Sequence, residues 1–317
     1  MFRFIVYRLL QLIPVMLLVS FIVFSFMHML PGDVIDALAG EAEAHDPAVR
    51  AALTKELGLD KPLYVQYAIW LGKIVLHGDF GKSIATRRTI GVEVFKRLPA
   101  TIYLAVAAVV ISLIIAVPLG TLAAIKRRSL TDYTVTTGAV LGLSIPQFWF
   151  AIVCVLVFAL YLGWLPASEY YSPFDDLWLG LKHLLMPAAA LGVRLAASTT
   201  RLTRASMLDE VRKEYVDTAR SLGLPEWRVI FKYTLRNALI PTVTIAGLQF
   251  AGLLGGTVVI EVIFSWPGIG LTLLDAINSR DYPMIQATVL ILAAVYVIVN
   301  LLVDITYRLL NPRIRLA

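Results

Sequence analysis

The chain has 317 residues, of which 59% are hydrophobic and only 16% are charged. A soluble domain carries about a quarter charged residues and fewer than half apolar ones, so this composition excludes an ordinary soluble protein and indicates a protein of the lipid bilayer. The net charge of +6 does not imply nucleic-acid binding, because cytoplasmic loops of membrane proteins collect Lys and Arg. The single cysteine, Cys154, lies in an apolar run, which excludes an internal disulfide and favours a packing role.

The first apolar run covers about residues 9–29 and follows two basic residues, Arg3 and Arg8. A cleaved signal peptide is the alternative interpretation, since a basic start and an apolar run are its usual features. The run is nevertheless long enough to cross roughly 30 Å of hydrocarbon, and the MHMLPGD that follows offers no small-x-small cleavage site. We therefore expect a retained first span.

Residues 30–99 form the longest hydrophilic stretch and are predicted to be a long outer loop. Within it Tyr64, Tyr67 and Trp70 recur at helical spacing, which predicts a short amphipathic or interfacial helix. The segment LHGDFGKS nearly spells a phosphate-binding loop, but Leu76 stands where the motif requires the first glycine. Nucleotide binding in this segment is not expected.

Three apolar runs predict the next spans, at about residues 101–125, 134–162 and 183–200. The second and third spans flank a basic cluster, Lys126 to Arg128, and Pro146 is expected to kink the third. The fourth is the least apolar of them and carries Arg194. Because a buried arginine is costly in a membrane, Arg194 is a candidate for the translocation path, although snorkelling or pairing with a neighbouring subunit would also explain it.

A charged stretch at residues 201–238 separates the fourth and fifth spans and is too regularly patterned for a simple connection. Residues 214–222 predict a helix that ends at Gly223, and Pro225 fits the start of a second short helix. In the second helix an apolar stripe recurs at spacings of three and four: Trp227, Ile230, Phe231, Thr234 and Leu235. Arg228, Lys232 and Arg236 run beside it. Two short helices with one apolar face suit docking into a groove on another protein.

The last two spans are predicted at about residues 239–263 and 285–305. Small residues let helices approach closely, so the glycines of the fifth span mark a candidate subunit interface or pore-lining face: Gly247, Gly252, Gly255 and Gly256. Glu261, near the outer end of this span, is a candidate gate or substrate contact, with a structural carboxylate as the alternative. Gln147, Gln249 and Trp266 complete the candidate path residues.

Charge distribution predicts which side each loop faces. Basic residues gather in the two termini, in the cluster after the second span and in residues 201–236, whereas the short loops on the other side hold only Lys182 and Arg280. By the positive-inside rule both termini and the central segment face the cytoplasm. The four histidines are scattered, and no metal-ligand spacing, nucleophile motif or complete phosphate loop appears, so catalysis by this chain is not expected.

At the central segment the residues resemble a specific motif. Asp217, Thr218 and Ala219 stand where the conserved cytoplasmic loop of ABC importer permeases has Glu-Ala-Ala, and Gly223 stands at the motif's glycine. Tyr233 and Leu235 take the places of its Ile and Leu, and Arg236 replaces its Pro. The longer pattern, ARSLGL followed by TLRNALIP, resembles the dipeptide, oligopeptide and nickel branch of that family, as do LPGD and GDFGKS in the first outer loop.

The resemblance implies an all-α, polytopic membrane protein with the type I ABC importer permease fold, six spans and a single permease domain over residues 1–317. It implies a bacterial or archaeal inner-membrane protein that pairs with a second homologous permease subunit, two ABC ATPase subunits and an extracytoplasmic substrate-binding protein. ATP and Mg²⁺ would lie on the ATPase subunits, and no cofactor, metal or nucleic acid is expected on this chain.

The same resemblance assigns the contacts with the ATPase to the coupling loop, which comprises Glu214, Asp217, Thr218, Ala219, Arg220, Leu222, Gly223, Leu224, Glu226 and Arg228. Trp227, Ile230 and Phe231 are expected to anchor this loop on the permease itself. The binding protein is expected to deliver cargo onto the outer loops around residues 33–97 and 266–282.

The cargo expected from the resemblance is a di- or oligopeptide or a glutathione-like peptide, with nickel or another non-peptide solute as the alternative. A secondary transporter driven by an ion gradient is the rival from another class. Such folds often carry internal repeats and several deep charges, whereas this sequence has no convincing repeat and only Arg194 as a deep charge. An intramembrane enzyme would need a nucleophile and base on neighbouring spans, and no such pair is apparent.

Overall fold

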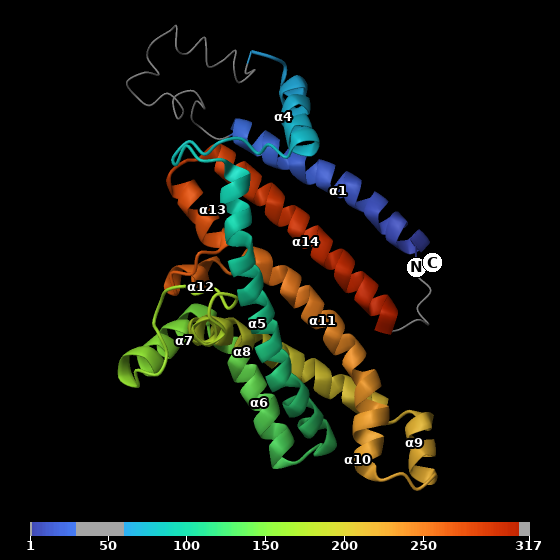
Figure 1. Cartoon of the computed structure of the whole chain (residues 1–317). Coiled ribbons are helices and arrows are strands. Elements are labelled where there is room, and N and C mark those ends of the chain that lie inside the picture. The colour runs from blue at the N-terminus through green and yellow to red at the C-terminus, as the bar shows by residue number, and fades with distance from the viewer. Residues whose placement is uncertain (1, 30–59, 311–317) are drawn as a thin grey trace. The chain divides into compact units, whose positions relative to one another are not determined.

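The computed structural model describes residues 2–29 and 60–310, and in these ranges the chain is helical apart from connecting turns and one isolated bridge between Lys82 and Thr89 (Figure 1). Within these ranges five helices are long and apolar enough to cross a membrane, and a bent pair of helices makes a sixth if it counts as one span. The prediction of an all-α polytopic protein is confirmed. Part of the predicted outer loop, residues 30–59 with Asp33 and His45, lies outside the described residues. The same holds for Arg313 and Arg315 near the C-terminus.

The chain divides into two compact units, one made of Met1–Pro99 and Pro267–Val297 and the other of Ala100–Trp266 and Ile298–Ala317. The first unit contains α1 (Phe2–Met29), α4 (Leu63–His77), α13 (Ile269–Asn278) and the first turns of α5 (Ile90–Ile125) and α14 (Tyr282–Leu310). The predicted amphipathic helix is α4. Tyr67 of α4 shares a hydrogen bond of 2.8 Å with Ser20 of α1 and packs edge-on against Phe24, whereas Tyr64 is exposed.

A buried carboxylate, Asp281, joins two segments of the first unit. Its side chain accepts hydrogen bonds from the Ser83 hydroxyl, from the Ala85 amide at 3.2 Å and from the Met284 amide at 3.2 Å. Burying a charge is favourable only where hydrogen bonds replace water, and here three donors do so. The segment before α5 is thereby fixed to the start of α14.

The second unit contains α5 from Ala100 onward, the last turns of α14, α6 (Leu130–Ser144), α7 (Gln147–Cys154), the π-helix η1 (Val155–Tyr161), α8 (Leu177–Glu210) and α9 (Glu214–Ser221). It continues with α10 (Glu226–Arg228), the π-helix η2 (Val229–Thr234), α11 (Leu235–Gly256) and α12 (Val258–Ile263) (Figure 1). The 34 residues of α8 enclose the predicted fourth span, 183–200. The hydropathy of the sequence marked only its apolar middle, whereas the helix begins at the cap formed by Asp176, whose side chain accepts from the Leu179 amide at 2.9 Å.

The third predicted span, 134–162, is not one kinked helix. The chain turns by 99° between α6 and α7–η1. Ile145 is extended, with φ −77° and ψ 124°, because the ring of the following proline disfavours helical backbone at the preceding residue. Pro146 therefore ends one helix and starts another instead of merely bending it. The predicted fifth span, 239–263, is also divided, between α11 and α12 at Gly256 and Thr257.

Two glycines allow α5 and α8 to approach closely. A Cβ atom on Gly192 of α8 would lie 2.7 Å from the Ala108 carbonyl oxygen of α5, and one on Gly120 of α5 would lie 2.8 Å from the Thr200 carbonyl oxygen of α8. Of the glycines predicted at an interface, Gly247 faces a side chain, since its Cβ would lie 2.6 Å from Cγ2 of Val303, whereas a Cβ on Gly252, Gly255 or Gly256 would meet nothing within 4 Å. At Gly120 and Gly192, by contrast, the backbones of α5 and α8 themselves meet.

Candidate functional site

The predicted coupling loop forms a hairpin of helices at one end of the second unit, where α9 lies beside α10 and η2 (Figure 1). The helix α9 ends where Gly223 takes φ +74°, and the amide of Gly223 donates to the Arg220 carbonyl at 2.9 Å. This left-handed conformation is cheap for glycine and costly for residues with a Cβ atom. The turn direction of the hairpin thus depends on the residue that the sequence had singled out.

A small apolar cluster holds α9 against η2. Val216 and Ala219 of α9 are buried against Val229 of η2, with Val211 and Leu224 packed around them. Ala219 is therefore a packing residue, whereas most of the other predicted coupling residues lie on the exposed side of the hairpin: Glu214, Asp217, Thr218, Arg220, Leu222, Gly223, Glu226 and Arg228. A small side chain at Ala219 lets the two helices meet closely.

One ion-pair network crosses the glycine turn. Arg220 donates to the Glu226 carboxylate at 2.9 Å and to Asp217 at 3.3 Å, so it joins α9 to the first turn of α10. These groups are exposed, so the pairs contribute little to stability and chiefly orient the side chains. Arg228 does not join this network; its guanidinium lies over the Trp227 ring at 5.3 Å.

A second network, absent from the sequence-based prediction, is centred on Tyr215. The Tyr215 hydroxyl donates to Glu210 at the end of α8 at 3.1 Å, and Asn237 of α11 donates to the Tyr215 oxygen at 3.0 Å. Partial burial, with a smaller contribution from the Glu210 carboxylate, raises the pKa of Tyr215, and the hydrogen bond with Glu210 raises the pKa of Lys213. Tyr215 thus links α9 to the ends of two long helices.

Ile230, Thr234 and Leu235 of the predicted stripe pack inward, but the second short helix differs from the prediction in two respects. First, α10 and η2 continue directly into α11, so this helix is the beginning of a longer one. Second, residues 229–234 are π-helical, and the Thr234 hydroxyl reaches back five residues to the Val229 carbonyl at 3.0 Å. Because a π-helix has more residues per turn than an α-helix, side chains three or four residues apart no longer face the same side.

As a result Val229 and Thr234 are buried, whereas Trp227 is 60% exposed and Phe231 is 58% exposed. Of the three expected anchors only Ile230 packs on the rest of the unit, against a cluster that includes Ala124 of α5, Met207 of α8 and Ala238 of α11. The hairpin is therefore joined to three long helices through Ile230 and Tyr215. Trp227 and Phe231 remain on its surface.

A bidentate ion pair joins α6 to α8 near the same end of the unit. The Arg204 guanidinium donates to both oxygens of Asp132, at 2.5 and 2.7 Å, and the Arg128 amide donates to Asp132 at 3.0 Å. Asp132 is 3% exposed. The two residues are 72 positions apart, so no local sequence pattern could have predicted the pair.

The candidate path residues fall into three places. Gln147 of α7 and Arg194 of α8 line one small cavity at the break between α6 and α7. Gln249 of α11 donates to the hydroxyls of Ser198 and Thr199 on α8, at 3.1 and 3.2 Å. The structure thus brings Gln147 and Arg194 together, and Gln249 instead joins two helices.

Glu261 and Trp266 are fully buried and form part of the interior of the unit. The Glu261 carboxylate accepts from the Thr257 hydroxyl at 2.7 Å and from the Thr101 hydroxyl at 3.2 Å. The Trp266 indole donates to the Ala100 carbonyl at 2.9 Å. Both side chains hold α12 and the following turn against α5, which fits the structural alternative for Glu261.

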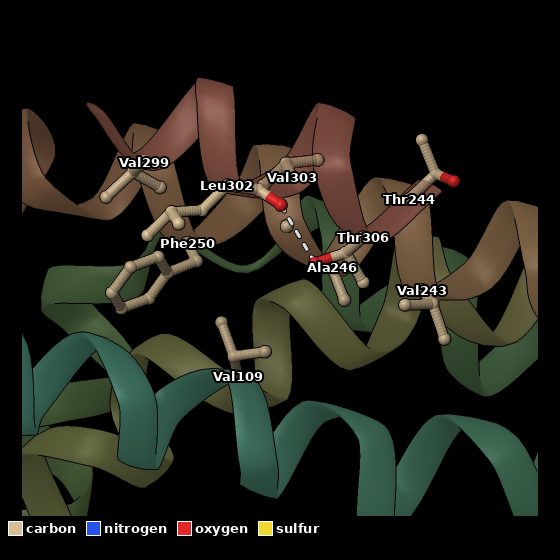
Figure 2. A pocket seen from close by; sticks show the side chains of 10 residues that line it. Val109, Val243, Thr244, Ala246, Phe250, Val299, Leu302, Val303 and Thr306 are labelled. Carbon is tan, nitrogen blue, oxygen red and sulfur yellow. Dashed lines mark hydrogen bonds between the residues drawn. The ribbon is translucent and has the colours of Figure 1, made fainter. Parts of the chain in front are cut away.

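Two larger cavities of the second unit are apolar. One, of about 270 Å³, lies among α5, α11 and the last turns of α14, and Figure 2 shows Val109, Phe250 and Val303 around it. Its two threonine hydroxyls, Thr244 and Thr306, donate to the Ile240 and Leu302 carbonyls at 3.0 and 2.8 Å, so neither is a free donor. The other, of about 340 Å³, lies among α5, α6 and α8. In residues 2–29 and 60–310 no three His, Cys, Asp or Glu side chains are grouped as metal ligands.

Comparison with known proteins covers nearly the whole chain. Residues 116–316 match the family described as binding-protein-dependent transport system inner membrane component, and residues 1–105 match the N-terminal part of such membrane components. The chain is 40% identical to the dipeptide transport system permease protein DppB of Alkalihalophilus pseudofirmus, with 97% of this chain and 98% of that protein covered.

The chain is also 41% identical to the glutathione transport system permease protein GsiC of Escherichia coli K12, over 99% of both proteins. Among solved structures, an amino acid ABC transporter with histidines matches at a TM-score of 0.46 and 18% identity, covering 70% of this chain and 94% of that chain. That likeness is too weak to carry an argument. The two permeases, by contrast, match the chain from end to end.

Proposed function

Because the chain belongs to the family of binding-protein-dependent transport system inner membrane components, we propose that it forms half of the translocation path for peptides in an ATP-driven importer. The observation that carries the substrate class is the identity of 40% and 41%, over nearly full length, to dipeptide and glutathione permeases. Di- or oligopeptides, including glutathione-like ones, are therefore the cargo we assign to it.

The coupling hairpin supplies the physical means of taking up energy from a separate ATPase. Its exposed side carries Asp217, Arg220 and Glu226, which are charged groups able to pair across a protein interface. Its inner side is fixed by Val216, Ala219 and Val229, so a push on α9 moves the hairpin as one body. ATP and Mg²⁺ are held by two ATPase subunits, each receiving one such hairpin.

The connections of the hairpin determine which helices follow it. Tyr215 joins α9 to the end of α8 and the start of α11, and Ile230 joins it to a cluster that reaches the end of α5. The ion pair between Asp132 and Arg204 adds α6 to this group. Closure of the ATPases would therefore reorient α5, α6, α8 and α11 together, which is the movement that alternating access requires.

The remaining partners follow from the same assignment. A second, homologous permease completes the path, and an extracytoplasmic binding protein delivers the peptide to the outer loops. The chain lies in the inner membrane with both termini in the cytoplasm, as the distribution of Lys and Arg favours. The hairpin then faces the cytoplasm, where the ATPase subunits are.

Transport by the purified assembly tests this function. The permease pair, the ATPases and the binding protein are reconstituted in proteoliposomes, and uptake of labelled Ala-Ala and of glutathione is measured with and without ATP. We expect uptake of peptide that requires both ATP and the binding protein. Uptake driven by an ion gradient without ATP would contradict the proposal, and so would ATP-driven uptake of nickel with no uptake of peptide.

A further inference from the structure

Arg194 lies at the middle of α8, one of the long helices of the second unit. It is the eighteenth of the 34 residues of α8, so it is about 25 Å from either end of the helix at 1.5 Å per residue. Long cationic side chains near helix ends can extend to the lipid headgroups, but one at mid-helix lies at the depth where a charge is most costly. A lipid phosphate is therefore a poor partner for this guanidinium.

The Arg194 side chain is exposed, although α8 is the most buried of the candidate spans. Its guanidinium forms no hydrogen bond or ion pair with any residue in 2–29 or 60–310. Arg204, ten residues further along the same helix, differs in this respect, because its guanidinium forms a bidentate ion pair with Asp132. A guanidinium left unpaired at this depth needs an anion or water from outside the chain.

The cavity beside Arg194 shows the size of the group that fits. It measures about 40 Å³ and is lined by Gln147 at the start of α7, by Phe150 and Val193, and by the backbone of Gly142. A water molecule needs at least about 10–15 Å³ of such volume, so the cavity has room for a few heavy atoms. A group the size of a carboxylate fits this volume, whereas a large side chain does not.

The polar groups around the cavity suit an anion. The guanidinium offers paired N–H donors that match the two oxygens of a carboxylate, and the Gln147 amide adds a neutral donor. The first turn of α7, where Gln147 stands, has no side-chain cap, and the partial positive charge of a helix N-terminus favours an anion. The rest of the lining is mostly apolar, and an ion pair is stronger in such surroundings than in water.

We propose that Arg194 and Gln147 form a subsite that binds the C-terminal carboxylate of the peptide as it passes through the membrane. This inference rests on the proposed peptide transport. A permease that takes peptides of varied sequence needs a contact with a group they all share, and the terminal carboxylate is such a group. Binding there would hold the peptide at mid-depth without selecting its side chains.

The test uses the reconstituted assembly with its binding protein and the tripeptide Ala-Ala-Ala as the probe. Arg194→Met removes the charge at similar length, Arg194→Lys keeps the charge, and Arg201→Gln removes an exposed arginine seven residues further along α8 as a matched control. Uptake is measured beside ATP hydrolysis stimulated by the loaded binding protein, and assembly is followed by size-exclusion chromatography.

We expect Arg194→Met to reduce uptake about tenfold or more while assembly and stimulated hydrolysis are kept, because it removes a charge-assisted hydrogen bond. Arg194→Lys should retain part of the uptake, Gln147→Ala should cause a smaller loss, and Arg201→Gln should have no effect. Uptake by Arg194→Met equal to that of the wild type would overturn the subsite.

Loss of assembly in Arg194→Met would also overturn it, because Arg194 would then pair with an acidic group of a partner subunit. A failure of the wild type to import peptide with ATP would instead overturn the proposed function and the subsite with it. The two failures are distinguishable, because only the second affects the unaltered protein.

Discussion

The packing of α5 on α8 and the attachment of the coupling hairpin are two ways of joining helices in the same unit. At the first, backbones meet directly, since Gly120 and Gly192 leave no room for a Cβ atom. At the second, hydrogen bonds of Tyr215 and a cluster of small apolar side chains hold α9 to its neighbours. The first contact holds α5 and α8 rigidly together. The second suits a segment that transmits the movement of an ATPase to the long helices.

The largest expected effect is at the contact of α5 with α8. Gly192→Val would place a side chain within 2.7 Å of the Ala108 carbonyl and 3.0 Å of the Ile111 side chain. We expect a loss of stability of about 3 kcal/mol or more, because neither helix can withdraw without breaking other packing. Thermal unfolding of the subunit in detergent measures it.

Gly252→Val is the matched control, since a Cβ atom at Gly252 would meet nothing within 4 Å. Its unfolding temperature should be close to that of the wild type, apart from the small helix-propensity effect. Equal unfolding temperatures for the two variants would contradict the claim that the contact of α5 with α8 is rigid.

The ion pair between Asp132 and Arg204 ranks next. Asp132→Asn leaves a guanidinium with one neutral partner, and a fully buried pair broken in this way costs about 3–5 kcal/mol. Because the Arg204 side chain is 27% exposed, we expect about 2 kcal/mol. Asp209→Asn, an exposed acid near the end of α8, serves as the control in the same unfolding measurement. An effect no larger than that of Asp209→Asn would show that α6 is held by other contacts.

At the coupling hairpin, a substitution of Gly223 should reduce the rate of uptake more than the stability of the subunit. Gly223→Val puts a β-branched residue at φ +74°, where L-residues lose roughly 1–2 kcal/mol. We expect the turn to change direction, so that uptake falls while membrane insertion and basal ATP hydrolysis persist. Gly223→Asn, which tolerates the left-handed region better, should keep most of the uptake. Full uptake by Gly223→Val would contradict the role of the turn.

The smallest effect is expected at Tyr215. Tyr215→Phe removes a hydroxyl that bonds Glu210 and Asn237, which is worth about 1 kcal/mol and so about a fivefold increase in amide hydrogen exchange of α9. Tyr64→Phe, at an exposed tyrosine of α4, should leave exchange in α9 unchanged. Unchanged exchange in both variants would mean that the cluster around Val216, without Tyr215, holds α9 in place.

The sequence could predict features that depend on local chemistry. The all-helical membrane fold and the family are confirmed, since long apolar runs and the motif around Gly223 need no knowledge of distant contacts. The helix predicted at 214–222 lies at Glu214–Ser221 in the structure, ending at the expected glycine. The roles of the coupling and path residues stay predictions.

What the sequence could not predict depends on departures from ideal helices and on distant residues. The stripe of Trp227 and Phe231 was read with α-helical spacing, and the π-helix at Val229–Thr234 changes which side chains face inward. The 99° turn at Pro146 exceeds a proline kink because Ile145 leaves the helical conformation as well. Tyr215 with Asn237 and Asp132 with Arg204 meet only when α8 and its neighbours have packed.

The central claim is that α9 touches a nucleotide-hydrolysing subunit on the cytoplasmic side, and site-directed cross-linking tests it most directly. Ser221→Cys places a thiol on the exposed end of α9, and the native Cys154 is buried. Thr86→Cys, in the exposed segment before α5, is the control from the predicted outer face. In the assembled complex we expect Ser221→Cys to cross-link to an ATPase subunit and Thr86→Cys not to do so. Labelling of Ser221→Cys by an impermeant reagent from the outer face, with no cross-link to an ATPase, would contradict the account.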